Sequence, residues 1–251
     1  MSPSRHRRRA EPAAAAPASG RGVLAGFLSL LGEVLITVGL VLALFVAYSL
    51  WWTNVLADRQ ASARGDEVRR QWLAPPSPSE PSRPAEPGAL DTQGGVGFLH
   101  VPAMGNGEVL VKRGTSPEVL NDGVAGYYTE PLKSALPSDP AGNFSLAAHR
   151  DGHGAKFHHI DKVRKGDAIV FETRDTWYVY KVFAELRQTS KYNVDVISPV
   201  PRESGRTAPG RYITLTTCTP VYTSKYRYVV WGELVRTEKA DADRTPPAEL
   251  R

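Results

Sequence analysis

The chain has 251 residues, 41% of them hydrophobic and 23% charged, which is typical of one globular domain with additional segments. Its formal net charge is +5, but residues 97–235 carry only +3, too little to indicate a nucleic-acid-binding surface. Cys218 is the only cysteine, so an intramolecular disulfide and a cysteine-rich zinc site are both excluded.

The N-terminal part of the chain has the features of a membrane anchor. Residues 1–22 contain five arginines and one glutamate without an apolar period, which predicts a disordered basic segment. Residues 23–52 contain a single charge, Glu33. The 19 uncharged residues Val34–Trp52 would form about 28 Å of helix, close to the thickness of a bilayer's hydrocarbon core. This run is too long for the apolar part of a cleaved signal peptide, and a buried core helix is seldom so apolar, so we predict an uncleaved signal anchor.

The charges around this anchor predict its orientation. Because the arginines precede it, the positive-inside rule places the N-terminus in the cytoplasm and the rest of the single-pass chain outside the plasma membrane. Residues 53–95 would follow as a short polar helix or juxtamembrane stalk at 53–73 and a Pro/Ser/Glu-rich linker at 74–95.

Residues 96–236 predict an all-β domain, most simply a closed barrel, followed by a polar tail at 237–251. Turn-forming residues separate seven runs rich in β-branched and aromatic residues: Gly97–Val101, Glu108–Lys112, Asn143–Ala148, Ala168–Glu172, Thr176–Arg187, Arg211–Thr217 and Arg227–Val235. Between the strands we expect only short helical turns, at Ser116–Asn121 and Gly154–Ile160.

Cys218 ends one of these strands. Because side chains alternate between the two faces of a strand, Cys218 shares the more polar face with Thr214 and Thr216. A lone cysteine is often a buried structural residue, but an exported free thiol is exposed to oxidation, so its retention favours a reactive role.

Two further residues are candidates to act with Cys218. Arg227 opens the next strand, and antiparallel pairing would bring its guanidinium beside the thiol, where a fixed cation favours a thiolate or a developing oxyanion. His149 ends an apolar strand before a glycine-rich turn, a position from which it could exchange protons with a nucleophile. Taken alone, Arg227 is equally consistent with a surface arginine, and a histidine placed like His149 is more often a polar loop residue than a catalyst.

Other polar and aromatic residues allow different interpretations. Four histidines lie within eleven residues, near Asp151 and Asp161, but their spacing matches no standard metal motif, so we expect neither a metal nor another cofactor. These histidines are His149, His153, His158 and His159. Tyr127 and Tyr128 are candidates to line a peptide groove, with packing on the barrel as the default.

Together these elements resemble the sortases. Thr-Leu-Thr-Thr-Cys at 214–218 is similar to the TLxTC signature of that family, Ala148-His149-Arg150 to its histidine-containing strand end, and Arg227 to its arginine before an apolar strand. The resemblance covers about residues 96–236. It departs from the family's frequent Gly-His-Arg only by having alanine at 148, which is also a small residue.

The resemblance implies a barrel of about eight strands and a cysteine transpeptidase on the outer face of a Gram-positive membrane. Cys218 would cleave a C-terminal sorting signal of surface proteins between Thr and Gly through a thioester, His149 would move protons, and Arg227 would steady the substrate or oxyanion. Thr217, Tyr127 and Tyr128 are the residues we expect to contact substrate. The acceptor would be an amine of a peptidoglycan precursor or cross-bridge.

The subclass follows from composition and from the resemblance. The abundance of Ala, Arg and Pro is typical of a high-GC actinobacterium, where class E sortases prefer LAxTG-like over LPxTG signals. No lid motif of a pilin polymerase precedes the first strand, which favours housekeeping anchoring. Two other functions stay open: a non-enzymatic barrel that binds wall peptides, and a hydrolase that uses the histidine cluster to hold a metal.

Overall fold

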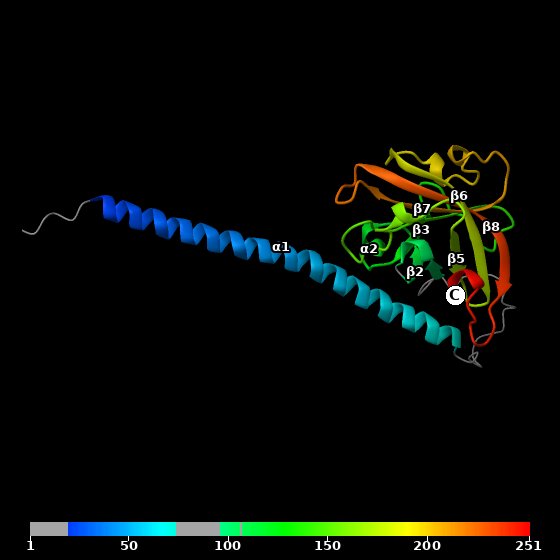
Figure 1. Ribbon diagram of the computed structural model, residues 1–251. Coiled ribbons are helices and arrows are strands. Elements are labelled where there is room, and N and C mark those ends of the chain that lie inside the picture. Colours follow the sequence, from blue (N-terminus) through cyan, green and yellow to red (C-terminus); the bar gives the residue numbers. More distant parts are fainter. Residues whose placement is uncertain (1–19, 74–95, 106) are drawn as a thin grey trace, which may run out of the picture. The chain divides into compact units, whose positions relative to one another are not determined.

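The computed structural model describes residues 20–73, 96–105 and 107–251 (Figure 1). The predicted basic segment up to residue 19 and the predicted linker at residues 74–95 lie outside the described residues. The chain divides between Ser49 and Leu50 into two units, and each is considered by itself.

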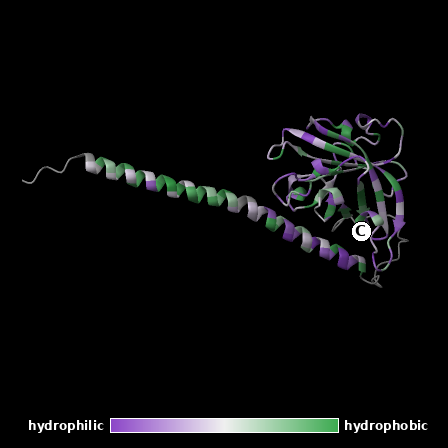
Figure 2. Cartoon of the chain, in the orientation of Figure 1, coloured by the Kyte–Doolittle hydropathy of each residue, from purple (hydrophilic) through white to green (hydrophobic). Residues whose placement is uncertain are grey.

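The first unit contains the apolar half of the helix α1, which runs over Gly20–Leu73. Hydrophobic residues occupy all sides of this half, and its large apolar side chains, such as Leu35 and Ile36, are exposed (Figure 2). A helix that is apolar all round needs an apolar environment. Within the described part of the chain, α1 alone is long and apolar enough to cross a membrane by length and composition.

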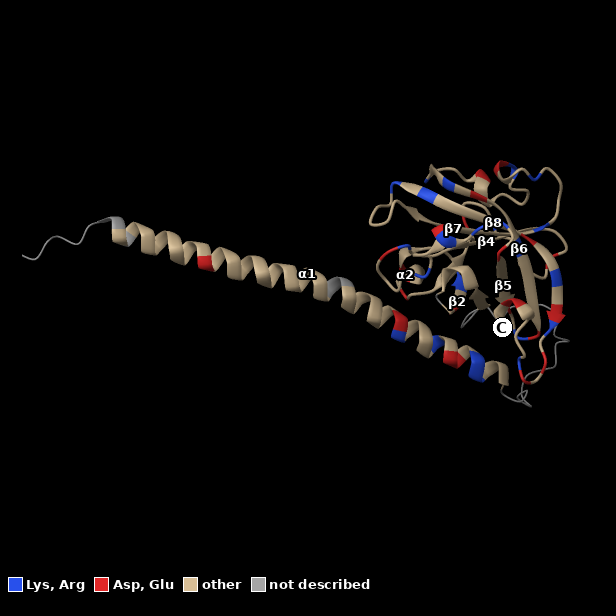
Figure 3. Ribbon diagram, viewed as in Figure 1, with Lys and Arg blue, Asp and Glu red and all other residues tan. Residues whose placement is uncertain are grey.

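The second half of α1 belongs to the unit that contains the barrel, and it differs in character. Acidic and basic residues recur along it (Figure 3), and small or apolar residues are buried at helical spacing: Ala57, Ala61 and Val68. Ala61 and Val68 pack in one cluster with Phe98, Leu110 and Val124 of the barrel domain, and Ala57 lies against Gly123. Residues 53–73 are therefore a continuation of α1 whose apolar stripe is covered by the domain.

Eight strands close into the barrel, in the order β1-β2-β3-β4-β7-β8-β6-β5. Their bounds are β1 Gly97–His100, β2 Glu108–Arg113, β3 Ala125–Tyr127, β4 Gly142–Ala147, β5 Ala168–Glu172, β6 Thr176–Ser190, β7 Arg211–Thr219 and β8 Tyr226–Lys239. The predicted closed all-β barrel with short helical turns is confirmed, and each of the seven predicted runs overlaps a strand. Closure leaves the sheet without free edges.

The helical turns follow the predictions only in part. A short helix α2, Pro117–Leu120, lies within the predicted turn at 116–121. The predicted helical turn at Gly154–Ile160 consists of single hydrogen-bonded turns, and the regular 3-10 helix begins only at its end, over Ile160–Lys162. Before it, residues 152–155 all have positive φ angles, which excludes a right-handed helix there.

Alternation along β7 decides which residues enter the core. Ile213 and Leu215 point into the barrel, where they are fully buried. The opposite face of β7 and β8 lies outside the barrel and is partly covered by residues of the long β6–β7 connection. Val196 and Ile197 of this connection pack there on Val229 and Trp231 of β8. Beyond this cover, the same outer face continues towards Cys218.

Candidate active site

Three adjacent strands bring the predicted site residues to one edge of the barrel. β4 runs parallel to β7, so both end at the same edge, and β8 runs antiparallel to β7 and therefore begins there. Ala147 of β4 is paired with Thr216 of β7. His149 follows the end of β4 by two residues, and the hydrogen bond from Thr217 to the Ala148 carbonyl keeps this segment beside the end of β7, where Cys218 lies.

Cys218 and Arg227 are directly opposite each other in the β7–β8 pair. Directly opposed residues of an antiparallel pair have their side chains on the same face, with Cβ atoms about 5 Å apart. The thiol is free and half-buried. Arg227 Nη1 donates to the carbonyl oxygens of Ser224 (3.2 Å) and Tyr226 (3.1 Å) at the end of the β7–β8 loop. These contacts hold one edge of the guanidinium against the backbone where the β7–β8 loop joins β8.

The backbone around His149 is fixed by hydrogen bonds from both sides. Thr217 Oγ1 donates to the Ala148 carbonyl (2.7 Å), and the Phe157 amide donates to the His149 carbonyl (3.0 Å). The imidazole itself is half-buried, with Nε2 2.8 Å from Asn121 Oδ1 at the end of α2. Because an amide oxygen only accepts, Nε2 carries the proton in this arrangement.

The surroundings of His149 favour its neutral form. Burial lowers the pKa of the imidazole, the nearby His153 lowers it further, and Asp151 offsets part of the shift. The rings of His149 and His153 lie 5.2 Å apart between centroids. A neutral imidazole at neutral pH has one nitrogen able to accept a proton and one able to donate, as general acid–base chemistry requires.

Tyr128 lies on the same outer face as Cys218. Its hydroxyl is 2.8 Å from Thr216 Oγ1, which donates its own proton to the Leu146 carbonyl (3.1 Å), so Tyr128 is the donor in this pair. Burial raises the pKa of Tyr128, and the charges of Arg227 and Cys218 both act on it. The tyrosine hydroxyl is therefore within electrostatic range of both site residues.

Tyr127 and Thr217 are not brought to this face. The Tyr127 ring lies in the barrel core beside Phe144, and its side chain is 6% exposed. Thr217 is 3% exposed, and its hydroxyl is bonded to the Ala148 carbonyl. Of the three residues expected to contact substrate, only Tyr128 faces the same side as the thiol, because alternation sends neighbouring residues to opposite faces.

The histidine cluster divides into two ring pairs, His149 with His153 and His158 with His159. His158 Nδ1 is 2.7 Å from the Arg150 carbonyl oxygen, so this nitrogen is hydrogen-bonded to the backbone. Among the described residues, three ligand-type side chains converge elsewhere, across the barrel from β7: His100, Glu108 and Glu172. Arg69 donates to both carboxylates there.

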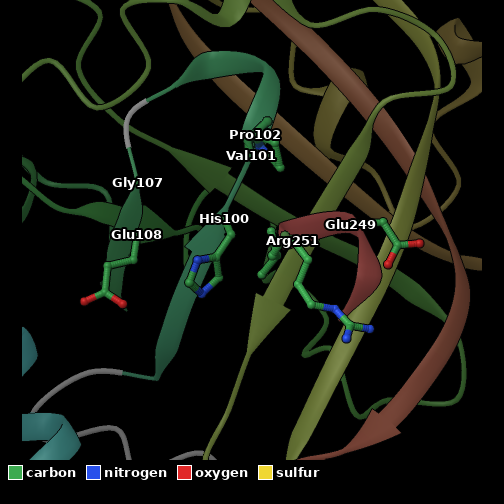
Figure 4. A pocket seen from close by; sticks show the side chains of 8 residues that line it. His100, Val101, Pro102, Gly107, Glu108, Glu249 and Arg251 are labelled. Carbon is green, nitrogen blue, oxygen red and sulfur yellow. The ribbon is translucent and has the colours of Figure 1, made fainter. Parts of the chain in front are cut away.

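A cavity of about 410 Å³ borders this second cluster. Figure 4 shows the His100 ring and the Glu108 carboxylate next to each other at the ends of β1 and β2, with Arg251 on the other side of the cavity. The histidine nitrogen is 3.0 Å from Glu172, and Arg244 also pairs with this carboxylate. The oxygens of Glu172 are thus shared between cationic side chains, which suits a structural ion-pair cluster.

Sequence reasoning missed Asn121, which contacts the candidate histidine directly. It lies 28 positions before His149, at the end of a helix of four residues, and no motif marks it. Thr216 was placed on the correct face, but its contact with Tyr128 depends on the pairing of β4 with β7, which sequence alone does not specify.

Comparison with known proteins agrees with this geometry. A sortase domain matches residues 99–235. The chain is 66% identical to sortase SrtE2 of Streptomyces coelicolor over 230 residues, covering 91% of this chain and 90% of that protein. It is 44% identical to sortase SrtE1 of the same organism, over 82% of this chain and 56% of that longer protein.

A solved structure shows the same barrel. The crystal structure of sortase E1 from Streptomyces coelicolor, which holds a tripeptide in its active site, is 46% identical and covers 62% of this chain and 96% of its own, with a TM-score of 0.59. With the domain match, the two relatives and the TLxTC strand end in agreement, this chain belongs to the sortase family of cysteine transpeptidases, within class E.

Proposed function

We propose that this transpeptidase cleaves an LAxTG- or LPxTG-like sorting signal between Thr and Gly and joins the released protein to an amine of the cell wall. Cys218 is the nucleophile, His149 the general acid and base, and Arg227 the cation that steadies the substrate or its oxyanion. The observation that supports this most strongly is the pairing of Cys218 with Arg227, with His149 just after the end of the neighbouring strand.

The first step forms a thioester. Cys218 Sγ bonds to the carbonyl carbon of the threonine, the carbonyl oxygen takes negative charge, and the C–N bond to glycine breaks as the tetrahedral intermediate collapses. The proton from the thiol passes through His149 to the leaving amine, so it is conserved within the step. Arg227, which is paired with Cys218 in the β7–β8 register, carries a cation suited to offset the oxyanion charge.

The second step transfers the acyl group. An amine from a peptidoglycan precursor or cross-bridge attacks the thioester, His149 accepts its proton, and sulfur leaves and is reprotonated. An amide bond replaces the amide that was cleaved, so the reaction needs no oxidant, nucleotide or cofactor. The tripeptide in the active site of sortase E1 supports a peptide substrate for this chain as well.

The apolar half of α1 supports a membrane-bound enzyme that takes its substrates at the bilayer surface. Substrates would be surface proteins that carry the C-terminal sorting signal. Arginines before the helix favour a cytoplasmic N-terminus and an extracellular catalytic domain. Among signals, we favour LAxTG because the chain falls in class E.

The test is cleavage of fluorogenic LAxTG and LPxTG peptides by the full chain in detergent, with an amine acceptor present. Cys218→Ala should abolish cleavage and transfer while the circular dichroism spectrum stays unchanged. His149→Gln and Arg227→Ala should each lower kcat by at least about 100-fold, the usual scale for loss of an acid–base group or an oxyanion donor.

The same experiment separates the alternatives. A wall-peptide-binding barrel would bind the peptides without turnover and show no fast alkylation of Cys218. A metal hydrolase would lose activity with a chelator and keep it in Cys218→Ala. Either result would overturn the proposed function.

A further inference from the structure

The second half of α1 contacts both loops that flank His149. One loop, residues 121–123, begins with Asn121, the partner of the imidazole nitrogen. The other, residues 152–156, contains His153, whose ring packs next to that of His149. The proposed chemistry does not involve α1, but residues in the range 54–64 of this helix contact both loops.

The contact with the first loop combines close packing and charge. Gly123 has a φ of +74° and lies so close to α1 that a methyl group there would be 2.8 Å from the Ala57 carbonyl oxygen. The next residue back, Asp122, pairs with Arg64 of α1 and with Lys112 of β2 (3.2 Å). Asn121 is therefore attached to a segment that α1 fixes at two points.

The contact with the second loop consists of directional hydrogen bonds. Asn54 Oδ1 accepts from the Gly154 amide at 3.0 Å, and Asp58 Oδ1 accepts from Lys156 Nζ at 2.7 Å. The two loops also meet here, since a methyl group on Gly154 would lie 3.3 Å from the Gly123 Cα atom. α1, the Asn121 loop and the His153 loop thus form one packed assembly.

The second loop has a backbone that needs such support. Four consecutive residues have positive φ: Gly152 (62°), His153 (46°), Gly154 (78°) and Ala155 (40°). Two of these, His153 and Ala155, are not glycine, and a non-glycine residue persists in this sparsely populated region only where the surrounding structure fixes it. The Asn54 side chain bonds to the amide of the third residue of this run.

From these contacts we infer that Asn54, Ala57, Asp58 and Arg64 of α1 are positioning residues for His149, through the Asn121 and His153 loops. This inference rests on the proposed role of His149. The helix does not touch the imidazole. It fixes the hydrogen-bond acceptor on one side of the ring and the neighbouring histidine on the other, which sets the direction of the nitrogen that exchanges protons.

The test uses the full chain in detergent and two matched double variants. Asn54→Ala with Asp58→Ala removes both polar contacts to the second loop. Gln60→Ala with Asp66→Ala is the control, because it makes the same kinds of change at exposed positions of the same helix. Peptide cleavage is measured with an amine acceptor, and the histidine rings are followed by NMR with carbon-13 at Cε1.

The positioning variant should lower kcat by about tenfold or more with KM unchanged, since misplacement of a catalytic group by about 1 Å can cost up to about 100-fold. Its His149 resonance, assigned with His149→Gln, should shift and broaden. The control should match the parent in both readouts. Alkylation of Cys218 should proceed at the parent rate in both, which separates a displaced histidine from a damaged strand β7.

Parent-like kcat and a parent-like His149 resonance in the positioning variant would overturn the inference. So would an equal fall in kcat in both variants, or a fall that accompanies a loss of circular dichroism signal. Failure of the proposed function gives a different result: Cys218→Ala would stay active, while the NMR comparison would still report whether α1 orients His149.

Discussion

At the scale of residues, the half-buried imidazole of His149 has neighbours that act on its charge in opposite directions. Burial and His153 disfavour the imidazolium, and Asp151 favours it. The net result is a pKa below the ordinary value of about 6.5. The imidazole is therefore neutral at neutral pH, with its nitrogen Nε2 directed to Asn121.

Replacing His153 should raise the pKa of His149. Asparagine is the suitable substitute, because it tolerates the positive φ of this position and cannot carry a positive charge. The loss of the His153 charge and the better solvation of the His149 ring both raise this pKa. NMR titration of the His149 Cε1 proton should show a higher midpoint in His153→Asn than in the parent.

The control is His159→Asn, at a histidine that packs on His158, and it should leave the His149 midpoint unchanged. A midpoint that stays or falls in His153→Asn would contradict the assigned cause.

The residue scale also shows how far sequence reasoning reached. Alternation along 213–218 correctly separated the core residues from the face that contains Cys218, because β7 is regular over this stretch. It did not separate Tyr127 from Tyr128, since a strand of three residues, Ala125–Tyr127, is too short to show a period. For the same reason β3 itself was missed.

At the scale of elements, one buried carboxylate joins three segments that are distant in sequence. Glu172, at the end of β5, is fully buried and accepts hydrogen bonds from Arg69 of α1 and from Arg244 of the C-terminal segment. His100 of β1 is 3.0 Å away. Arg244 also lies over the Trp72 ring, 4.7 Å from its centroid, so the same arginine contacts α1 as well as the barrel.

Glu172→Gln should destabilise the protein substantially. It removes the negative charge with which both Arg69 and Arg244 pair. Removing one partner of a buried ion pair typically costs about 3–5 kcal/mol. Urea unfolding followed by tryptophan fluorescence should show the loss. The control Glu67→Gln removes an exposed carboxylate that pairs within α1, and should leave the urea midpoint where it is. Equal midpoints for the two variants would show that the cluster does not stabilise the fold.

The same carboxylate predicts a response to acid. Burial alone would raise the pKa of Glu172, but His100 and Arg69 outweigh it and lower the pKa to about 2 from an ordinary value of 4.5. A depressed carboxylate pKa stabilises the folded state above the ordinary value, and this contribution is lost as pH falls from about 4.5 to about 2. The parent should therefore lose more stability across this range than Glu172→Gln does.

The elements also show what sequence alone leaves open. The sequence predicts residues 53–73 as a short polar helix or juxtamembrane stalk and indicates no surface against which it packs. The buried stripe of Ala57, Ala61 and Val68 consists largely of small residues, so it gives only a weak apolar period. Its role becomes visible only when Phe98 and Leu110, which cover it, are placed by the barrel.

At the scale of the whole molecule, the chain combines an apolar helical half, exposed on all sides, with a barrel unit that has its own buried core. The exposed apolar half is consistent with a bilayer around it. The arginines of residues 1–22 then favour one orientation, with Cys218 outside the cell. A cell-wall amine is available as an acceptor only on that side.

The single cysteine makes this topology measurable. A membrane-impermeant maleimide added to intact cells should label the chain at Cys218, because the thiol is partly exposed and no other cysteine competes. Cys218→Ala should give no label, and a cytosolic thiol protein in the same cells should remain unlabelled until the membrane is opened. Labelling of the chain only after permeabilisation would place the barrel in the cytoplasm, away from both the wall amine and exported substrates. The outcome therefore bears on the whole proposed reaction, since a transpeptidase and its acceptor must share a compartment.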